Sequence, residues 1–119
     1  CAENKSIFTG EDKTSVRDIL LGIKGNISVT ANIVPLEMHN MCKLAMEGKA
    51  EEANKINSKI DILHDNLFIE SNPIPFKWAL HRMGLIKKGI RLPLTWLDEK
   101  YEEILEKSLH NSDIILKNK

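Results

Sequence analysis

His39 and Cys42, two residues with metal-binding side chains, are three positions apart, so a helix would carry them on one face. Neutral imidazole and thiolate both bind Zn²⁺, but a zinc site needs three or four such ligands. Cys42 falls among apolar residues, and the remaining histidines are on other predicted helices: His64, His81 and His110. We therefore predict no metal site, a solvated His39 and a reduced, buried Cys42.

Lys77 directly precedes Trp78 and follows two prolines. A partly desolvated amine of this kind can form a Schiff base with a carbonyl compound. A lysine at the start of a helix, with its stem packed on the aromatic ring, fits the same pattern and is the interpretation we favour. The sequence has no glycine-rich phosphate loop, serine elbow or clear acid–base pair. The residues alone therefore indicate a mostly helical module and no reaction.

The N-terminal part of the chain has a strand–helix–strand–helix pattern. The segment "SIF" ends in a turn at Gly10, and Asp12 or Thr14 is expected to cap a helix of about ten residues. The apolar face of this helix consists of Val16, Ile19, Leu20 and Ile23. Gly22 and Gly25 mark its end. "NISV", residues 26–29, is predicted as a buried strand, and Pro35 begins the next helix. Strands that feed helices imply a parallel sheet, and two strands are too few for one.

Downstream of this pattern, the periodicity predicts helices only. The first carries Met38, Met41, Cys42 and Ala45 on one face and ends at Gly48. The second begins near Ala50, with apolar residues recurring every three or four positions: Ala53, Ile56, Ile60, Leu63 and Leu67. Two prolines interrupt the pattern, and a helix resumes from Pro75 to Met83. A last helix, capped by Asp98 or Thr95, is expected to bury Tyr101, Ile104, Leu105 and Leu109. The predicted fold class is mainly α.

The composition narrows the class of partner. The chain has 119 residues, with 17 basic and 17 acidic side chains and two cysteines. Zero net charge gives no long-range attraction for nucleic acid or for an anionic membrane. No apolar run reaches the roughly 20 residues of a membrane span, and two cysteines are too few for a disulfide scaffold. We expect a cytoplasmic protein without a cofactor, whose partners are small molecules or proteins.

Three phrases, in this order, carry a resemblance to a known family: "ISVTAN" at 27–32, "NPIPFKWAL" at 72–80 and "RLPLT" at 91–95. Together with "TGED" at 9–12, they resemble the C-terminal part of the 4-hydroxy-tetrahydrodipicolinate synthases, also called the dihydrodipicolinate synthase family. The likeness covers nearly the whole chain and fades after Glu99. N-acetylneuraminate lyases share the architecture but usually lack "NPIP" together with "RLPLT", and they are the alternative within the superfamily.

The resemblance implies a (β/α)8 TIM barrel followed by a helical domain. Residues 1–47 would be strand 7, helix 7, strand 8 and helix 8 of the barrel, and residues 48–119 the C-terminal three-helix domain. Family members condense pyruvate, held as a Schiff base on a lysine of the sixth strand, with aspartate semialdehyde in lysine and diaminopimelate biosynthesis. That lysine would precede this chain, so we expect no catalytic residue here and an inactive isolated chain.

The resemblance carries two substrate-binding positions over to this sequence. Ile27 matches the isoleucine that contacts bound pyruvate, and Gly10 matches the glycine that leaves room at the catalytic mouth at the end of strand seven. Read from the residues alone, they are a buried aliphatic and a turn glycine.

A second hypothesis is a helical interaction or oligomerisation module without catalysis. Strands that lack their neighbours have unpaired backbone edges, and such edges pair with other copies or convert to helix. We therefore expect a homo-oligomer in which another chain covers the exposed face, with the chains intertwined.

Overall fold

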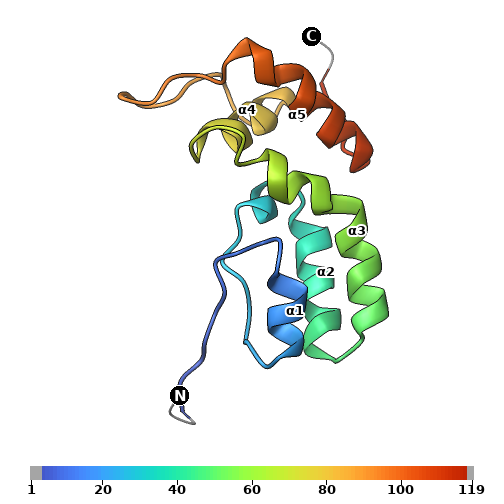
Figure 1. Cartoon of the computed structure of the whole chain (residues 1–119). Helices are drawn as coiled ribbons and strands as arrows, with labels where there is room; N and C mark the ends of the chain where they lie inside the picture. Colours follow the sequence, from blue (N-terminus) through green and yellow to red (C-terminus); the bar gives the residue numbers. More distant parts are fainter. Residues whose placement is uncertain (1–3, 118–119) are drawn as a thin grey trace. The chain divides into compact units, whose positions relative to one another are not determined.

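The structure of this chain is a computed structural model that describes residues 4–117, and helices dominate that range. The helices follow one another as α1 (Ser15–Leu20), η1 (Thr30–Asn32), α2 (Pro35–Met46), α3 (Ala50–Asn66), α4 (Ile74–Arg82) and α5 (Glu99–Asn111) (Figure 1). η1 is a short 3₁₀ helix. The chain forms two compact units, which divide within α3 between Ser58 and Lys59. The mainly α prediction is confirmed, and no helix in residues 4–117 is long and apolar enough to cross a bilayer.

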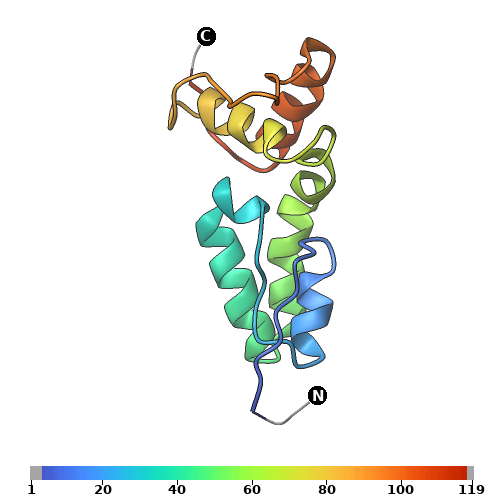
Figure 2. The same cartoon turned by 90° about the vertical axis from the view of Figure 1, so that its left-hand side faces the viewer.

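Neither predicted strand forms a regular β-strand in the described residues. Segment 7–9 instead runs alongside segment 24–27, with Lys24 N donating to Ile7 O at 2.8 Å and Thr9 N donating to Gly25 O at 3.0 Å (Figure 2). Within residues 4–117, a single isolated parallel bridge is present, between Thr9 and Asn26. Within residues 4–117 each of these segments pairs only with the other, whereas a strand in a closed barrel pairs on both sides.

The second extended segment also ends earlier than predicted. Val29 already has helical backbone angles, φ −78° and ψ −44°, and serves as the N-cap of η1. The prediction of a strand through Val29 was therefore wrong. The physical reason is that the donors at the start of η1 find an acceptor on another segment, which favours the turn over continued extension.

Helix α1 is shorter than expected and is not capped as predicted. It spans six residues, and Gly22 follows it with a φ of +110°. Thr14 is at the N-cap position but makes no side-chain capping bond, and its hydroxyl donates to Asp18 instead. Val16 and Ile19 are buried, and α1 packs on α2.

Helices α2 and α3 follow the predicted periodicity closely. Met38, Met41 and Ala45 are buried on α2, which is followed by Gly48 with a φ of +76°. Ala53, Ile60, Leu63 and the following Leu67 are buried along α3. Two expected core residues are only half-buried: Cys42 and Ile56.

The second unit has its core between α4 and α5, which contact each other. Its buried apolar residues include Ile74, Trp78, Ala79, Leu97, Leu105, Leu109 and Ile114. Trp78 Nε1 donates to Glu102 Oε1 at 3.2 Å, and Arg82 pairs with Glu106. Asp98 caps α5 as predicted, since its carboxylate accepts from Lys100 N.

Two features at the end of the second unit depart from the sequence pattern. Ile104, expected to point inward, is 41% exposed, and Tyr101 is half-buried. After α5 the chain turns at Asp113, which has a φ of +59°, and Lys117 N donates to Arg82 O at 2.8 Å. The tail therefore folds back beside α4 and does not continue α5.

Candidate functional site

The two predicted substrate-binding positions lie next to each other in the first unit. Gly10 and Ile27 each follow one residue of the Thr9–Asn26 bridge, and Ile27 N donates to Thr9 O at 2.9 Å. A Cβ atom built on Gly10 would have no neighbouring atom within 4 Å. The backbone pairing thus brings both positions to the same end of the two extended segments, with open space beside the glycine.

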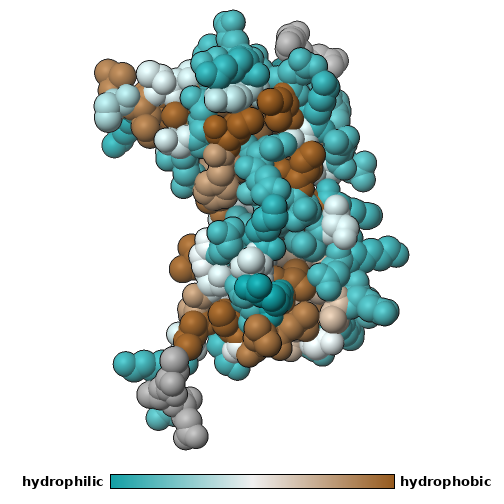
Figure 3. All heavy atoms as spheres, viewed as in Figure 1, coloured by the Kyte–Doolittle hydropathy of each residue, from teal (hydrophilic) through white to brown (hydrophobic). Residues whose placement is uncertain are grey.

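Apolar side chains around this pairing are exposed. Ile27 is 75% exposed, Ile7 44% and Phe8 54%, and the space-filling view shows apolar side chains on the surface beside the N-terminal segment (Figure 3). The expectation from the residues alone, a buried aliphatic at position 27, is therefore wrong. An apolar side chain that faces solvent at the end of an extended segment is suited to a ligand or to a further part of a fold.

Asp12, expected from the sequence as a possible cap of the helix that follows it, is a further residue of this site. Its side chain is 3% exposed, and its Oδ1 accepts from Asn26 Nδ2 at 2.7 Å. Its Oδ2 accepts from Val29 N and Thr30 N, each at 3.0 Å. The carboxylate thus caps η1 and not α1. The available sequence signal for this residue was an acidic side chain shortly after a turn glycine. That signal does not reveal its partners, which are 14 to 18 residues away in the sequence.

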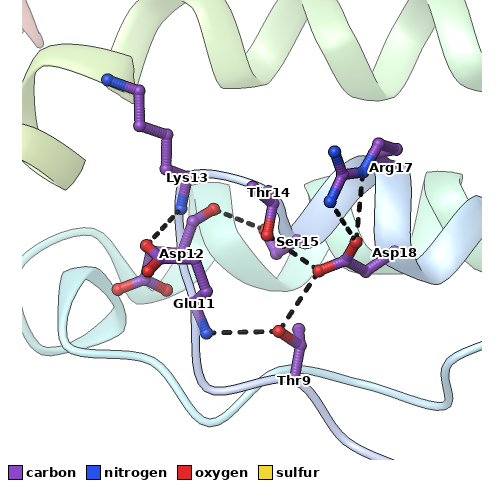
Figure 4. A network of polar contacts seen from close by, with 8 residues as sticks. All are labelled: Thr9, Glu11, Asp12, Lys13, Thr14, Ser15, Arg17 and Asp18. Carbon is purple, nitrogen blue, oxygen red and sulfur yellow. Dashed lines mark hydrogen bonds and ion pairs between the residues drawn. The ribbon is translucent and has the colours of Figure 1, made fainter.

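Asp18 on α1 gathers a second set of polar contacts around the same turn (Figure 4). Its carboxylate accepts from Thr14 Oγ1 at 2.8 Å and Thr9 Oγ1 at 3.3 Å, and Arg17 Nη2 lies 3.1 Å from it. The hydrogen bond from Thr14, with the neighbouring Arg17 guanidinium, lowers the pKa of Asp18. The contact to Thr9 ties the bridge residue to the helix that follows it.

His39 and Cys42 border an open pocket of about 220 Å³ at η1 and α2. Its other lining residues are Asn26, Ser28, Ala31, Pro35 and Met38. Burial, followed by the negative charge of Asp12, raises the pKa of the Cys42 thiol. A raised pKa leaves less of the thiolate, the form that binds metals and acts as a nucleophile, at neutral pH. In the part of the chain that the structure describes, no three His, Cys, Asp or Glu residues are grouped to hold a metal ion.

Lys77 and the remaining histidines belong to the second unit. Lys77 is half-buried on α4. His64 is buried on α3, His81 stacks edge-on against Trp96 with ring centroids 5.7 Å apart, and His110 is exposed on α5.

The chain is similar to known proteins over nearly its whole length. Residues 1–112 match the Dihydrodipicolinate synthetase family. The chain is 51% identical over 116 residues to the 4-hydroxy-tetrahydrodipicolinate synthase of Thioalkalivibrio sulfidiphilus, covering 98% of this chain and 40% of that protein. It is 54% identical over 110 residues to the synthase of Pseudomonas putida, and the match covers 92% of this chain and 38% of that protein. The chain thus spans about two fifths of the length of the curated relatives it matches.

Solved structures give the same result. The dihydrodipicolinate synthase from Acinetobacter baumannii, complexed with pyruvate, superposes with a TM-score of 0.90 at 52% identity, over 92% of this chain and 38% of that one. The enzyme from Aquifex aeolicus superposes with a TM-score of 0.93 at 37% identity, over 98% of this chain and 40% of that one.

Proposed function

This chain belongs to the dihydrodipicolinate synthetase family, and from that premise we propose that it is the C-terminal part of a 4-hydroxy-tetrahydrodipicolinate synthase. The whole enzyme would condense pyruvate with aspartate semialdehyde in the cytoplasm, in lysine and diaminopimelate biosynthesis. The match of residues 1–112 to the family carries this proposal. The superpositions on two synthases, with TM-scores of 0.90 and 0.93, support it. The lysine that binds pyruvate as a Schiff base would lie outside this chain.

Residues 1–47 would supply the last two βα units of a (β/α)8 barrel, and residues 48–119 the C-terminal helical domain. The parallel Thr9–Asn26 bridge, with α1 between its two residues in sequence, supports this assignment, because a barrel repeats strand, helix and parallel strand. The remaining strands would restore the missing neighbours of both extended segments. The contacts within the chain divide it at a different place, within α3, between Ser58 and Lys59.

Ile27 and Gly10 would line the pyruvate pocket in the whole enzyme. Barrel enzymes gather their chemistry at the C-terminal ends of the strands, and both residues follow the bridge at that end. The exposed Ile27 side chain would form an apolar wall that excludes water from the bound pyruvate. The missing side chain of Gly10 would leave room at the mouth of the pocket.

The whole enzyme would be a homo-oligomer. A solved relative that is 33% identical to this chain is described as the first monomeric dihydrodipicolinate synthase variant, which supports assembly as the ordinary state of such enzymes. Leu21, 79% exposed after α1, and Leu36, 65% exposed on α2, are apolar side chains that an assembled enzyme would have to cover or tolerate.

A joined protein tests the proposed function. The upstream segment of the Pseudomonas putida synthase would be fused in frame to residues 1–119. We expect the joined protein to consume pyruvate and aspartate semialdehyde, and borohydride to inactivate it only when pyruvate is present. We expect the isolated chain to do neither. A joined protein that folds but is not inactivated in this way would refute the proposal, and so would activity in the isolated chain.

Matched substitutions in the joined protein test the role of Ile27. We expect Ile27→Ala to raise the KM for pyruvate about tenfold, equivalent to about 1.4 kcal/mol of lost contact. Leu36→Ala removes a similarly exposed aliphatic side chain from α2 and should leave this KM unchanged. Equal effects of the two substitutions would argue against a pyruvate contact at Ile27.

A further inference from the structure

We propose that Asp12 is a positioning residue of the pyruvate pocket, and that its buried carboxylate fixes Gly10 relative to Ile27. Asp12 can act in this way only if Gly10 and Ile27 line that pocket, so the inference rests on the proposed function. Asp12 is two residues beyond Gly10, and its side chain reaches the segment that carries Ile27. It is therefore a side-chain link between the two positions, in addition to the backbone bridge next to them.

The donors to Asp12 lie on both sides of Ile27 in the sequence. Asn26, immediately before Ile27, donates through Nδ2 to Oδ1, while Val29 and Thr30, two and three residues after it, donate through their backbone N–H groups to Oδ2. One carboxylate thus holds both flanks of Ile27. Removing the Asp12 carboxylate would remove these side-chain links on both flanks and leave only the backbone pairing with Thr9 to set the direction of the Ile27 side chain.

The surroundings of Asp12 make this link strong. Its side chain is 3% exposed, and hydrogen bonds to an ionised acceptor are strengthened where water is excluded. The main chain of Asp12 is also fixed, because its carbonyl oxygen accepts from Ser15 Oγ at 2.8 Å and from Ser15 N at 3.2 Å. The carboxylate therefore extends from an anchored turn.

A neighbouring acid provides a matched control for Asp12. Glu11 is exposed, and its carboxylate accepts from Lys13 N at 3.4 Å, within its own turn. Asp12→Ala and Glu11→Ala both remove one negative charge from this turn. Only Asp12→Ala removes the side-chain connection to the segment around Ile27.

Asn26 allows a rescue experiment, because substitutions at Asp12 and Asn26 can first disrupt and then restore the hydrogen bond between the two side chains. Asn26 Oδ1 is buried and has no hydrogen-bond partner within the described residues. An amide introduced by Asp12→Asn could donate to this oxygen if the Asn26 amide turned over, while its own oxygen accepts from Val29 N and Thr30 N. Asn26→Asp, in contrast, would place two carboxylates at hydrogen-bond distance, where like charges repel. Adding Asp12→Asn to Asn26→Asp restores a donor to the pair.

The test uses the joined protein described above, with pyruvate kinetics and amide hydrogen exchange of the peptide that contains Val29 and Thr30. We expect Asp12→Ala to raise the KM for pyruvate about tenfold, with a smaller change in kcat, and to speed exchange in that peptide. Glu11→Ala and Asp12→Asn should stay close to the parent. Asn26→Asp should raise the KM at neutral pH, and the combined Asp12→Asn and Asn26→Asp variant should recover it.

A folded Asp12→Ala variant with an unchanged KM for pyruvate would overturn the inference, and so would an equal change in Glu11→Ala. If Asp12→Ala does not fold, the test rests on the Asn26→Asp variant and the combined Asp12→Asn and Asn26→Asp variant. A raised KM that the second substitution restores supports the positioning role, and an unchanged KM overturns it. If the unmodified joined protein folds but is inactive, the proposed function fails and this role with it. The exchange measurement then still reports whether Asp12 links the two segments.

Discussion

Ser108 joins two helices of the second unit through a buried hydroxyl, and its removal has a predictable cost. Its Oγ accepts from Asn66 Nδ2 at 2.7 Å and donates to Ile104 O at 2.8 Å, and the residue has no exposed surface. Ser108→Ala would leave the half-buried Asn66 amide without this acceptor. The Ile104 carbonyl would lose less, because it is also part of the backbone hydrogen-bonding of α5.

Two opposing terms set the size of the effect. Removing one partner of a buried hydrogen bond costs about 1–3 kcal/mol. Alanine is a better helix former than serine by about 0.5 kcal/mol, which offsets part of that cost on α5. We therefore expect Ser108→Ala to lower the free energy of unfolding by about 1–2 kcal/mol.

Urea unfolding of the 119-residue chain, followed by circular dichroism, measures this cost. A double-mutant cycle with Asn66→Ala should give a coupling energy of about 1 kcal/mol between the two side chains. Ser58→Ala is the matched control, because the exposed Ser58 hydroxyl donates to Asn54 O within α3 and should matter by less than about 0.5 kcal/mol. A coupling energy near zero, or equal losses in the two serine variants, would refute the reasoning.

Three further changes have expected outcomes. Gly48→Ala should lower the free energy of unfolding by about 1 kcal/mol in urea, because Gly48 has a φ of +76°, and Gly48→Asn should cost less. The backbone N–H of Lys100 lowers the pKa of Asp98, so the carboxylate stabilises the folded chain above its ordinary pKa of 3.8 and this contribution is lost as the pH falls through the lowered value; acid should therefore shift the urea midpoint less in Asp98→Asn than in the parent. Partial burial raises the pKa of Cys42, so iodoacetamide should alkylate it more slowly in the folded chain than in urea at the same pH, and equal rates would contradict this half-buried environment.

The helices were predictable from the sequence because their signals are local. The recurrence of Ala53, Ile60 and Leu63 identifies α3 without any knowledge of what covers it, and Gly48 marks the turn before α3 because glycine tolerates positive φ. Asp98 was recognisable as a cap for the same reason, since its partner is two residues away. Local patterns also explain the error at Ile104, which shares a helix with buried residues but sits at the edge of their stripe.

The loss of both predicted strands and the partners of Asp12 were not predictable in this way, because they depend on residues far apart in the chain. A β-branched run such as "NISV" forms a strand only where neighbours pair with it, and here one short segment does so. Asp12 looks like a helix cap from its neighbours in sequence, yet its carboxylate binds Asn26 and the start of η1. The proposal that Gly10 and Ile27 line a substrate pocket came from a resemblance to a known family, since neither residue type by itself signals such a site.

The exposed apolar residues of the first unit also govern how the chain responds to salt. Sulfate and phosphate are excluded from protein surfaces and strengthen the tendency of apolar groups to leave water. Ile7, Phe8 and Ile27 can satisfy that tendency only by contact with other molecules, since the folded chain leaves them 44%, 54% and 75% exposed. Salting-out should therefore begin at lower sulfate concentrations for this chain than for the joined protein, in which the proposed barrel would cover the same side chains.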